Sequence, residues 1–270
     1  MSETERLRAN LSKLTLPTIA AIFEAEAIKA TKSELSYTAF LARLIDEELA
    51  AKIDRSIATR IAKAHFPAVH TLEGFDFAFQ PSLSASRIRE LAELGFLGRA
   101  ENIVLVGRPG VGKTHLATAI GLRACQARKR VLFVAAAELV DQLLADEVSR
   151  RLAKTIEGLG RLDLLVVDEL GYLPMDGHRA KLFFQLVSHL YTRTAMIVTT
   201  NVPFETWGTL FAGDEVIAAA ILDRLLHHSH VFLVTGPSYR MKGKLAQRVG
   251  NPAKVPDDNG DQMESGVGQI

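Results

Sequence analysis

The chain has 270 residues, of which 48% are hydrophobic and 23% charged, and its formal net charge is +1. So small a net charge excludes nucleic-acid binding through the overall field of the molecule, so any such binding must use local basic patches. The single cysteine, Cys125, excludes an internal disulfide and is expected to be a small buried side chain. No signal peptide, long apolar run or lipidation motif is recognisable, which predicts a cytoplasmic protein that does not bind membranes.

Residues 5–64 carry apolar side chains at helical spacing, and Pro17 and Ser36 divide them into separate helices. Ser36 is typical of an N-cap for the long helix that follows it. We therefore predict a small all-α N-terminal domain over residues 1–70 that binds DNA or a protein partner. Residues 71–98, punctuated by proline and glycine, are predicted to connect it to the next domain.

The second half of the long helix has an apolar stripe formed by Ile53, Ile57 and Ile61, at four-residue spacing. Four cations lie on the opposite side: Lys52, Arg55, Arg60 and Lys63. A second basic group lies further along the chain: Arg150, Arg151 and Lys154. We expect these groups to contact the phosphates of double-stranded DNA, with strong salt dependence and little sequence preference. The alternative is an ordinary solvated helix face.

The segment GRPGVGKT matches the pattern of a phosphate-binding loop, a glycine and four variable residues followed by Gly-Lys and Ser or Thr. It follows the apolar run NIVLV and precedes a good helix former, which is the strand–loop–helix context that such a loop requires. Lys113 is predicted to contact the β- and γ-phosphates of ATP, and Thr114 to bind Mg²⁺. The predicted ATP-binding residues of the loop are Gly107, Arg108, Pro109, Gly110, Val111, Gly112, Lys113, Thr114 and His115.

Five short, almost continuously apolar runs begin near residues 102, 130, 162, 195 and 230 and alternate with helical segments. Such runs are typical of strands buried on both faces. The pattern therefore predicts an α/β domain over residues 99–250 with a doubly wound, parallel five-stranded sheet. Residues 251–270 are rich in Gly, Asp, Asn and Pro and are predicted to be a disordered tail.

The third apolar run ends in Asp168 and Glu169. A carboxylate at the carboxyl end of a buried strand lies at the crevice where open α/β sheets bind nucleotides. We therefore predict that Asp168 holds Mg²⁺ together with Thr114. Glu169 is then placed to orient or deprotonate the attacking water.

The fourth run ends in Asn201, whose side chain is placed to hydrogen-bond the attacking water or the γ-phosphate. The alternative is that it caps the segment that follows. Arg224 lies in the helix before the last run. It either stabilises transition-state charge in a neighbouring subunit or forms an ordinary surface ion pair with Asp223 or Glu215. The residues by themselves leave these two roles open.

Several segments together resemble the IstB-like transposition helper ATPases, AAA+ proteins that are similar in turn to DnaC-type helicase loaders and DnaA-type initiators. Besides the phosphate loop, these segments are DELGYLP (168–174), TTNVPFETW (199–207), AAAILDRLLHH (218–228) and GPSYRMK (236–242). The resemblance runs from about Leu7 to Lys242. Its most specific parts are Asn-x-Pro-Phe-x-x-Trp and the Asp-Arg-Leu-Leu-His run.

The resemblance implies a P-loop AAA+ core whose C-terminal lid is reduced to a short stub. It gives Asn201 the sensor-1 role and Arg224 the role of an arginine finger on the ATP of an adjacent protomer. Arg240 resembles the sensor-2 position at the nucleotide. The family further implies ATP-driven assembly of a homo-oligomer on DNA and recruitment of a DDE-type transposase for target-site selection.

Two other functions share part of this pattern. A DnaC-type replicative helicase loader has the same ATPase elements and differs in its partner. A small-molecule kinase uses the same phosphate loop but needs an acceptor pocket and a mobile arginine-rich lid, and neither is recognisable after the glycine loop.

Overall fold

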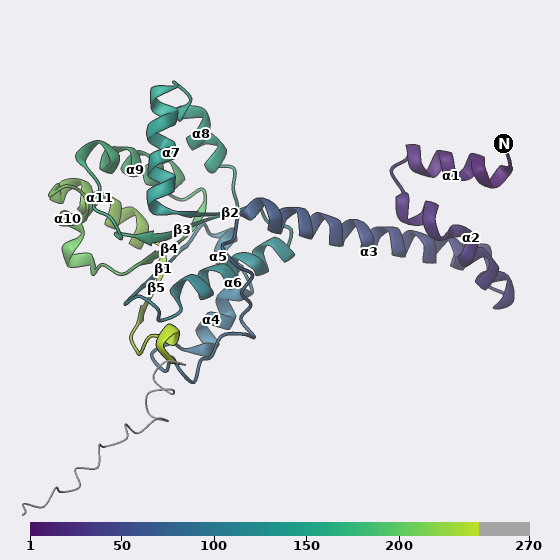
Figure 1. Ribbon diagram of the computed structural model, residues 1–270, viewed down its shortest axis with the longest axis horizontal. Coiled ribbons are helices and arrows are strands. Elements are labelled where there is room, and N and C mark those ends of the chain that lie inside the picture. The colour runs from purple at the N-terminus through teal and green to yellow at the C-terminus, as the bar shows by residue number, and fades with distance from the viewer. Residues whose placement is uncertain (243–270) are drawn as a thin grey trace, which may run out of the picture.

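The computed structural model of the protein describes residues 1–242 (Figure 1). Three helices come first: α1 (Glu3–Lys13), α2 (Pro17–Lys32) and α3 (Tyr37–Ala64). Pro17 is the first residue of α2, a position at which its missing N–H costs no helical hydrogen bond. Ser36 caps α3 by accepting a hydrogen bond from the N–H of Ala39. Both predicted breaks are therefore confirmed.

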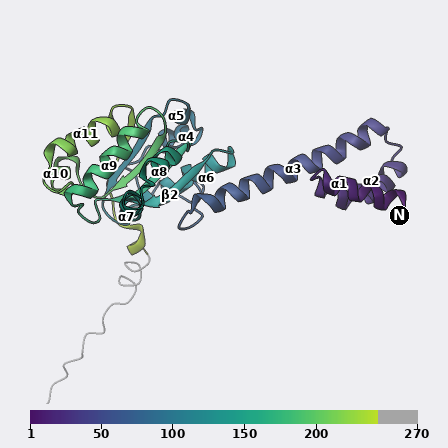
Figure 2. The same cartoon turned by 90° about the horizontal axis from the view of Figure 1, so that it is seen from above.

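The first half of α3 packs with α1 and α2 into a helical hairpin, which has a small core of Ile19, Phe23 and Leu44. From there α3 continues as a stalk to the rest of the molecule (Figures 1 and 2). Its 28 residues span roughly 42 Å at about 1.5 Å per residue. The last turn of α3 packs against β2 and α6, and its Ala64 is fully buried there.

The remaining described residues form a parallel sheet covered by helices on both faces. Its strands are β1 (Asn102–Gly107), β2 (Val131–Ala135), β3 (Leu164–Leu170), β4 (Ala195–Thr200) and β5 (Ser229–Val234). They lie in the order β2-β3-β4-β1-β5, and every neighbouring pair is parallel. The predicted α/β class and all five predicted strands are confirmed.

The helices of this part are α4 (Ala85–Ala92), α5 (Gly95–Gly98), α6 (Lys113–Gln126), α7 (Ala136–Val148), α8 (Leu152–Leu159), α9 (Gly177–Leu190), α10 (Trp207–Leu210) and α11 (Glu215–Leu226). One face of the sheet packs against α4 and α6, and the other against α7, α9 and α11. In β3, Leu164 and Val166 lie in the core that α4 and α6 cover, whereas Leu165 and Val167 lie in the core on the opposite face of the sheet. Because successive side chains enter different cores, the strand reads as a continuous apolar run.

After β5 the described chain ends just past a short turn, η2 (Tyr239–Met241). The predicted tail at 251–270 and the predicted end of the ATPase domain at 243–250 lie outside the described residues. Cys125 is buried in α6, as expected. Within residues 1–242, no helix is both long enough and apolar enough to cross a membrane.

Candidate functional site

A cavity of about 700 Å³ lies at the carboxyl ends of β1, β3 and β4. Its lining comes from parts of the chain that are far apart in sequence: the loop at 109–115, the ends of β3 and β4, the segment 70–80 and the turn η2. This is the edge of a parallel sheet at which α/β domains bind their ligands. The cavity therefore lies where the sequence places the phosphate loop and the paired carboxylates.

Glycines shape the loop between β1 and α6. A Cβ on Gly107 would lie 2.3 Å from the carbonyl oxygen of Val234 in the adjacent strand β5, so no larger residue fits. Gly112 has a φ of +101°, and a Cβ there would lie 2.7 Å from the ring of Phe75. Because α6 begins at Lys113, the free N–H groups of its first turn lie at the loop. This arrangement suits a bound anion such as a triphosphate.

Lys113 is buried beneath the loop, and its Nζ donates to the carbonyl oxygens of Gly107 (2.6 Å) and Arg108 (2.9 Å). Burial lowers the pKa of this ammonium group, while the carboxylates of Asp168 and Glu169 act in the opposite direction. An anion at the loop would offer the ammonium charged oxygens in place of two neutral carbonyls, which makes a stronger hydrogen bond.

Asp168 is buried at the end of β3 and lies between two threonines. Thr114 Oγ1 lies 3.1 and 3.0 Å from its two carboxylate oxygens, and the hydroxyl of Thr199 in β4 donates to it at 2.5 Å. Carboxylate and hydroxyl oxygens are hard ligands of the kind that Mg²⁺ prefers. The predicted metal ligands Thr114 and Asp168 thus lie together, and the residues present fit a Mg²⁺ ion.

Glu169 is exposed in the cavity because β3 is irregular at this point. Val167 pairs with Val198 and Leu170 pairs with Thr200, so β3 contains one residue more than β4 between these pairs. Glu169 has a φ of +58°, a left-handed conformation that costs a residue other than glycine roughly 1 kcal/mol. Bulges of this type re-aim side chains next to active sites. Here the bulge separates a buried Asp168 from a Glu169 that reaches the cavity.

Asn201 lines the cavity one strand away from the carboxylates. The alternative role that the sequence left open, capping the next segment, belongs to its neighbour Thr200, whose Oγ1 accepts from the Val202 N–H at 3.1 Å. The following turn η1 (Phe204–Thr206) has no side-chain cap. Arg240 of η2 also lines the cavity.

Arg224 lies outside this cavity. It is in the last turn of α11, beside the first residues of β1 and β4, and hence at the opposite edge of the sheet. Its guanidinium lies 5.0 Å from the centre of the Phe184 ring and donates to the carbonyl oxygen of Ala220 at 2.9 Å. Within residues 1–242 it makes no ion pair with Asp223 or Glu215, so the surface-pair alternative finds no support.

The segment after α3 forms a wall of the cavity that the sequence did not predict. Four of its side chains line the cavity: His70, Phe75, Asp76 and Gln80. His115, next to the phosphate loop, stacks on His70 with ring centres 4.4 Å apart. Burial lowers the pKa of His70, and the neighbouring His115 adds to this effect. The cluster of phenylalanines at 75, 77 and 79 was the one sequence signal for this wall.

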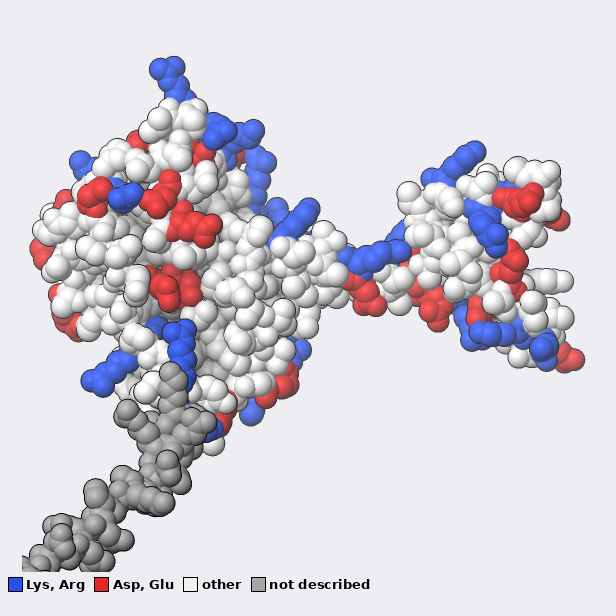
Figure 3. Space-filling model, in the orientation of Figure 1, with Lys and Arg blue, Asp and Glu red and all other residues white. Residues whose placement is uncertain are grey.

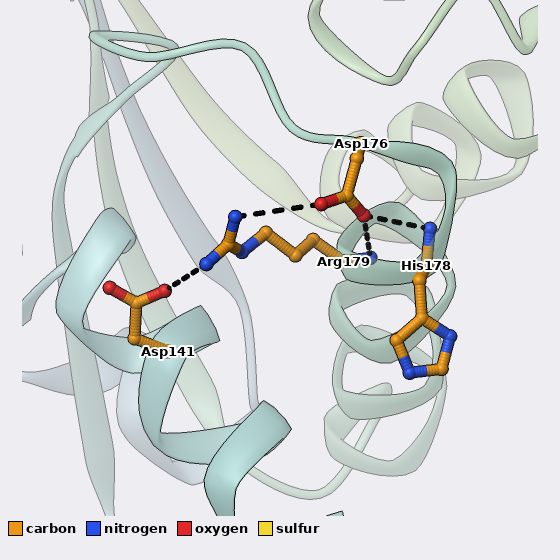
Figure 4. A network of polar contacts seen from close by, with 4 residues as sticks. All are labelled: Asp141, Asp176, His178 and Arg179. Carbon is orange, nitrogen blue, oxygen red and sulfur yellow. Dashed lines mark hydrogen bonds and ion pairs between the residues drawn. The ribbon is translucent and has the colours of Figure 1, made fainter.

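The residues after Glu169 are held in place by an ion-pair network (Figure 4). Arg179 of α9 reaches across to α7, where its Nη2 contacts Asp141 Oδ1 at 2.6 Å. Asp176 caps α9 by accepting from the N–H groups of His178 and Arg179 at 3.0 and 2.9 Å. These contacts anchor the segment between Glu169 and α9 at its α9 end. Tyr172, from this segment, also lines the cavity and was not predicted.

The cations considered for DNA contact differ in their surroundings. On α3, Lys52 and Lys63 are exposed, whereas Arg55 lies 3.0 Å from the buried carboxylate of Glu48. Arg60 is half-buried, and its Nε is buried without a hydrogen-bond partner, so it is not on the open face that the helical spacing predicts. In the second group, Arg150 and Lys154 are exposed and form no ion pair with any residue of 1–242. Arg151 lies 3.3 Å from Asp146.

Comparison with known proteins places the chain among ATP-binding proteins of insertion sequences. The family model of the IstB-like ATP binding protein matches residues 9–247. The ATP-binding protein of insertion sequence IS21 from Pseudomonas aeruginosa is 40% identical over 263 residues, covering 97% of this chain and 99% of that protein. That of IS5376 from Geobacillus stearothermophilus is also 40% identical, over 243 residues and 90% and 96% of the two chains.

Solved structures share the fold. AMPPCP-bound DnaA from Aquifex aeolicus matches with a TM-score of 0.54 and 20% identity, over 70% of this chain and 59% of its own. DnaI matches with a TM-score of 0.51 and 21% identity, over 63% and 89% of the two chains. At these identities the likeness shows a shared fold and no more.

Proposed function

Because the chain belongs to the family of IstB-like ATP-binding proteins, we propose that it is an ATP-dependent, DNA-binding helper of transposition that works as a homo-oligomer. In this proposal the protein acts in the cytoplasm and assembles on double-stranded DNA when ATP binds. It then recruits a DDE-type transposase to the target site. Mg²⁺-dependent hydrolysis of ATP dismantles the assembly.

The observation that carries the proposal is the position of Arg224 relative to the cavity. The other proposed catalytic residues lie at one edge of the sheet, whereas Arg224 lies at the opposite edge. A side chain so placed cannot reach the triphosphate of its own subunit. It is available to a neighbouring subunit stacked on that edge, where an arginine in trans stabilises transition-state charge.

The residues of the cavity have separate tasks in hydrolysis. Lys113 binds the β- and γ-phosphates, and Asn201 and Arg240 contact the γ-phosphate from the other walls. Thr114 and Asp168 would hold Mg²⁺, which when bound neutralises charge on the phosphates. Glu169, exposed at the cavity, orients and deprotonates the attacking water. In this proposal the buried carboxylate of Asp168 binds the ion and the exposed carboxylate of Glu169 acts on the water.

The decisive experiment mixes two inactive variants. Glu169→Gln removes the base while leaving the loop intact, and we expect it to bind ATP and remain trapped as an oligomer on duplex DNA. Arg224→Ala keeps the base, and we expect its turnover to fall by about 10³-fold. In an equimolar mixture, some sites combine Glu169 of one subunit with Arg224 of the next. Phosphate release should then recover to about a quarter of the wild-type rate for random pairing.

A mixture as inactive as its components would show that Arg224 does not act across subunits. The matched control is Glu93→Gln, which makes the same chemical change at the exposed C-cap of α4. This variant should hydrolyse ATP at the wild-type rate. Lys113→Ala tests the dependence on ATP, since it should abolish both nucleotide binding and assembly in sedimentation velocity.

The relatives among insertion-sequence proteins favour a transposase over a replicative helicase as the partner. The helicase-loader alternative is tested by capture of the full chain, with ATP, on an immobilised DDE-type transposase and on a replicative helicase. Binding to the helicase alone would decide for the loader.

A further inference from the structure

Three basic segments lie next to one another along one edge of the molecule. They are the second half of α3, the turn between α6 and β2, and the turn between α7 and α8. The end of α3 packs against β2 and α6. The residue before β2, Arg130, bonds through its N–H to Asp163 at 2.7 Å, just past the end of α8. The α6–β2 turn therefore lies close to the end of α3 and to the end of α8, and the eight residues of α8 lead from there to the α7–α8 turn.

Six cations of these segments have no ion-pair partner within residues 1–242. They are Lys52, Lys63, Arg128, Lys129, Arg150 and Lys154. The carboxylates nearby are already paired, Glu48 with Arg55, Asp146 with Arg151 and Asp163 with Arg130. Asp54 of α3 lies roughly 160–180° around the helix from Lys63 and Lys52, at about 100° per residue. The edge therefore has excess positive charge in a protein that is nearly neutral overall.

Figure 3 shows this distribution directly. Lys and Arg side chains gather along the edge that leads from the α7–α8 turn down to the stalk α3. Asp and Glu side chains in the same view lie over the middle and the far rim of the core, at its lower side and on the stalk. Such a local band satisfies the requirement, set by the small net charge, that nucleic-acid binding must use a patch.

We propose that the six cations form one surface, the edge track, that binds the phosphate backbone of double-stranded DNA. The inference rests on the proposed function and adds to it the turn between α6 and β2, with Arg128 and Lys129. It also replaces the separate basic groups by one continuous surface. Lysines and arginines without base-edge partners neutralise phosphates, so the track binds duplexes of any sequence and loses affinity steeply with salt.

The track lies apart from the nucleotide cavity but is connected to it through α6. This helix begins at Lys113 in the phosphate loop and ends at Gln126, two residues before Arg128. Its 14 residues place the two sites roughly 20 Å apart. A change in the track can therefore be made without touching a residue of the cavity.

The backbone conformation at two of these cations allows their charge to be removed without changing the fold. Arg128 and Arg150 each follow the end of a helix with a φ of +60° and +57°. In each turn the next residue bonds back to the helix, Lys129 to Ala124 at 2.9 Å and Arg151 to Asp146 at 2.6 Å. Glycine is the residue that favours this conformation. Replacing either arginine by glycine therefore removes the charge and leaves the fold in place.

The experiment compares the wild type with the double variant Arg128→Gly/Arg150→Gly for binding to a labelled duplex, with a non-hydrolysable ATP analogue and at several salt concentrations. We expect roughly 25-fold weaker binding near physiological salt, and a slope of log affinity against log salt that is smaller by about 2. The variant Arg128→Lys/Arg150→Lys should restore most of the affinity. ATP binding and the melting temperature should stay at or above the wild-type values.

Two controls separate charge from conformation. Thr192→Gly changes another left-handed turn, with a φ of +59°, and Lys181→Ala removes an exposed cation of α9. Both should bind DNA as the wild type does. Wild-type affinity in the double glycine variant would overturn the edge track while leaving the proposed function intact. If instead the wild type itself binds no duplex with nucleotide present, the proposed function fails together with the track.

Discussion

Among single side chains, Thr199 has the most consequential hydrogen bonds in the site. Its one hydroxyl donates to Asp168 and accepts from the N–H of Glu169, and the residue is 1% exposed. Thr199 thereby positions the buried carboxylate of Asp168 and holds the bulge in β3 that carries the exposed Glu169. Thr199 acts through these two residues, so it is a positioning residue.

We predict that Thr199→Val lowers the free energy of unfolding by roughly 1–3 kcal/mol, because the buried carboxylate of Asp168 and the N–H of Glu169 each lose a hydrogen bond. The rate of ATP hydrolysis should fall at least about tenfold, with a smaller effect on ATP affinity, since the loop is untouched. Denaturant titration and a phosphate-release assay measure the two effects. Thr118→Val is the control: that hydroxyl is buried in α6 without a partner, so its removal should leave stability unchanged or higher.

Among the elements, the helical hairpin depends on a carboxylate of α3 that caps α2. Glu48 is 3% exposed, and its Oε2 accepts from the N–H groups of Thr18 and Ile19 at 2.8 and 3.0 Å. These are free N–H groups in the first turn of α2, where Leu16 provides no side-chain cap. A negative charge at this position also interacts favourably with the helix dipole.

We predict that Glu48→Ala destabilises the hairpin by roughly 2–3 kcal/mol, since two N–H groups lose their acceptor and Arg55 loses its partner. Hydrogen exchange of the α1 and α2 amides should accelerate, while exchange in the sheet stays unchanged. Glu47→Ala, the exposed neighbour, is the matched control and should have little effect. Equal protection in both variants would contradict the capping role.

The same contact predicts a pH dependence. Burial by itself raises the pKa of Glu48, but the hydrogen bonds from Ile19, Thr18 and Arg55 outweigh it, so the net pKa is lowered from 4.5. A lowered folded-state pKa means that the stabilisation is present above the unfolded-state value and is lost as the pH falls below it. Hairpin protection, normalised to intrinsic exchange rates, should therefore decline below about pH 4.5 more steeply in the wild type than in Glu48→Gln, where Glu26, whose pKa is lowered by its hydrogen bond to Lys29, still titrates.

In the molecule as a whole, one continuous stretch links the hairpin to the nucleotide cavity. The stalk α3 ends at Ala64, and the chain that follows it places His70 and Phe75 on the phosphate loop. Phe75 also meets His115, with ring centres 5.2 Å apart. A nucleotide bound in the cavity would therefore lie against the segment that leads directly into the stalk.

We predict that Phe75→Ala weakens ATP binding about tenfold, because the nucleotide loses an apolar wall of the cavity. Titration with a fluorescent ATP analogue measures the change. Val69→Ala, which changes a 68% exposed side chain of the same segment, should leave the affinity unaltered. An unchanged affinity in Phe75→Ala would mean that the connector wall does not contact the nucleotide.

Local patterns in the amino-acid sequence determined the phosphate loop, the five strands, the helix starts marked by Pro17 and Ser36, and the adjacent carboxylates Asp168 and Glu169. Each of these is specified by residues a few positions apart, because backbone geometry and hydrophobic periodicity act over that range. Spacing along a single helix was less reliable, since it placed the half-buried Arg60 on an open face. The spacing of residues along a helix does not show which other elements pack against that helix.

Only the tertiary structure decided the contacts between residues that are distant in sequence. Thr199 meets Asp168 across 31 positions through the pairing of β3 and β4, and Phe75 reaches Gly112 because the connector folds back over the loop. The same packing places Arg224 at the far edge of the sheet and gathers three basic segments along one side. These arrangements depend on which surfaces bury one another, and burial is a property of the folded molecule that no short stretch of sequence contains.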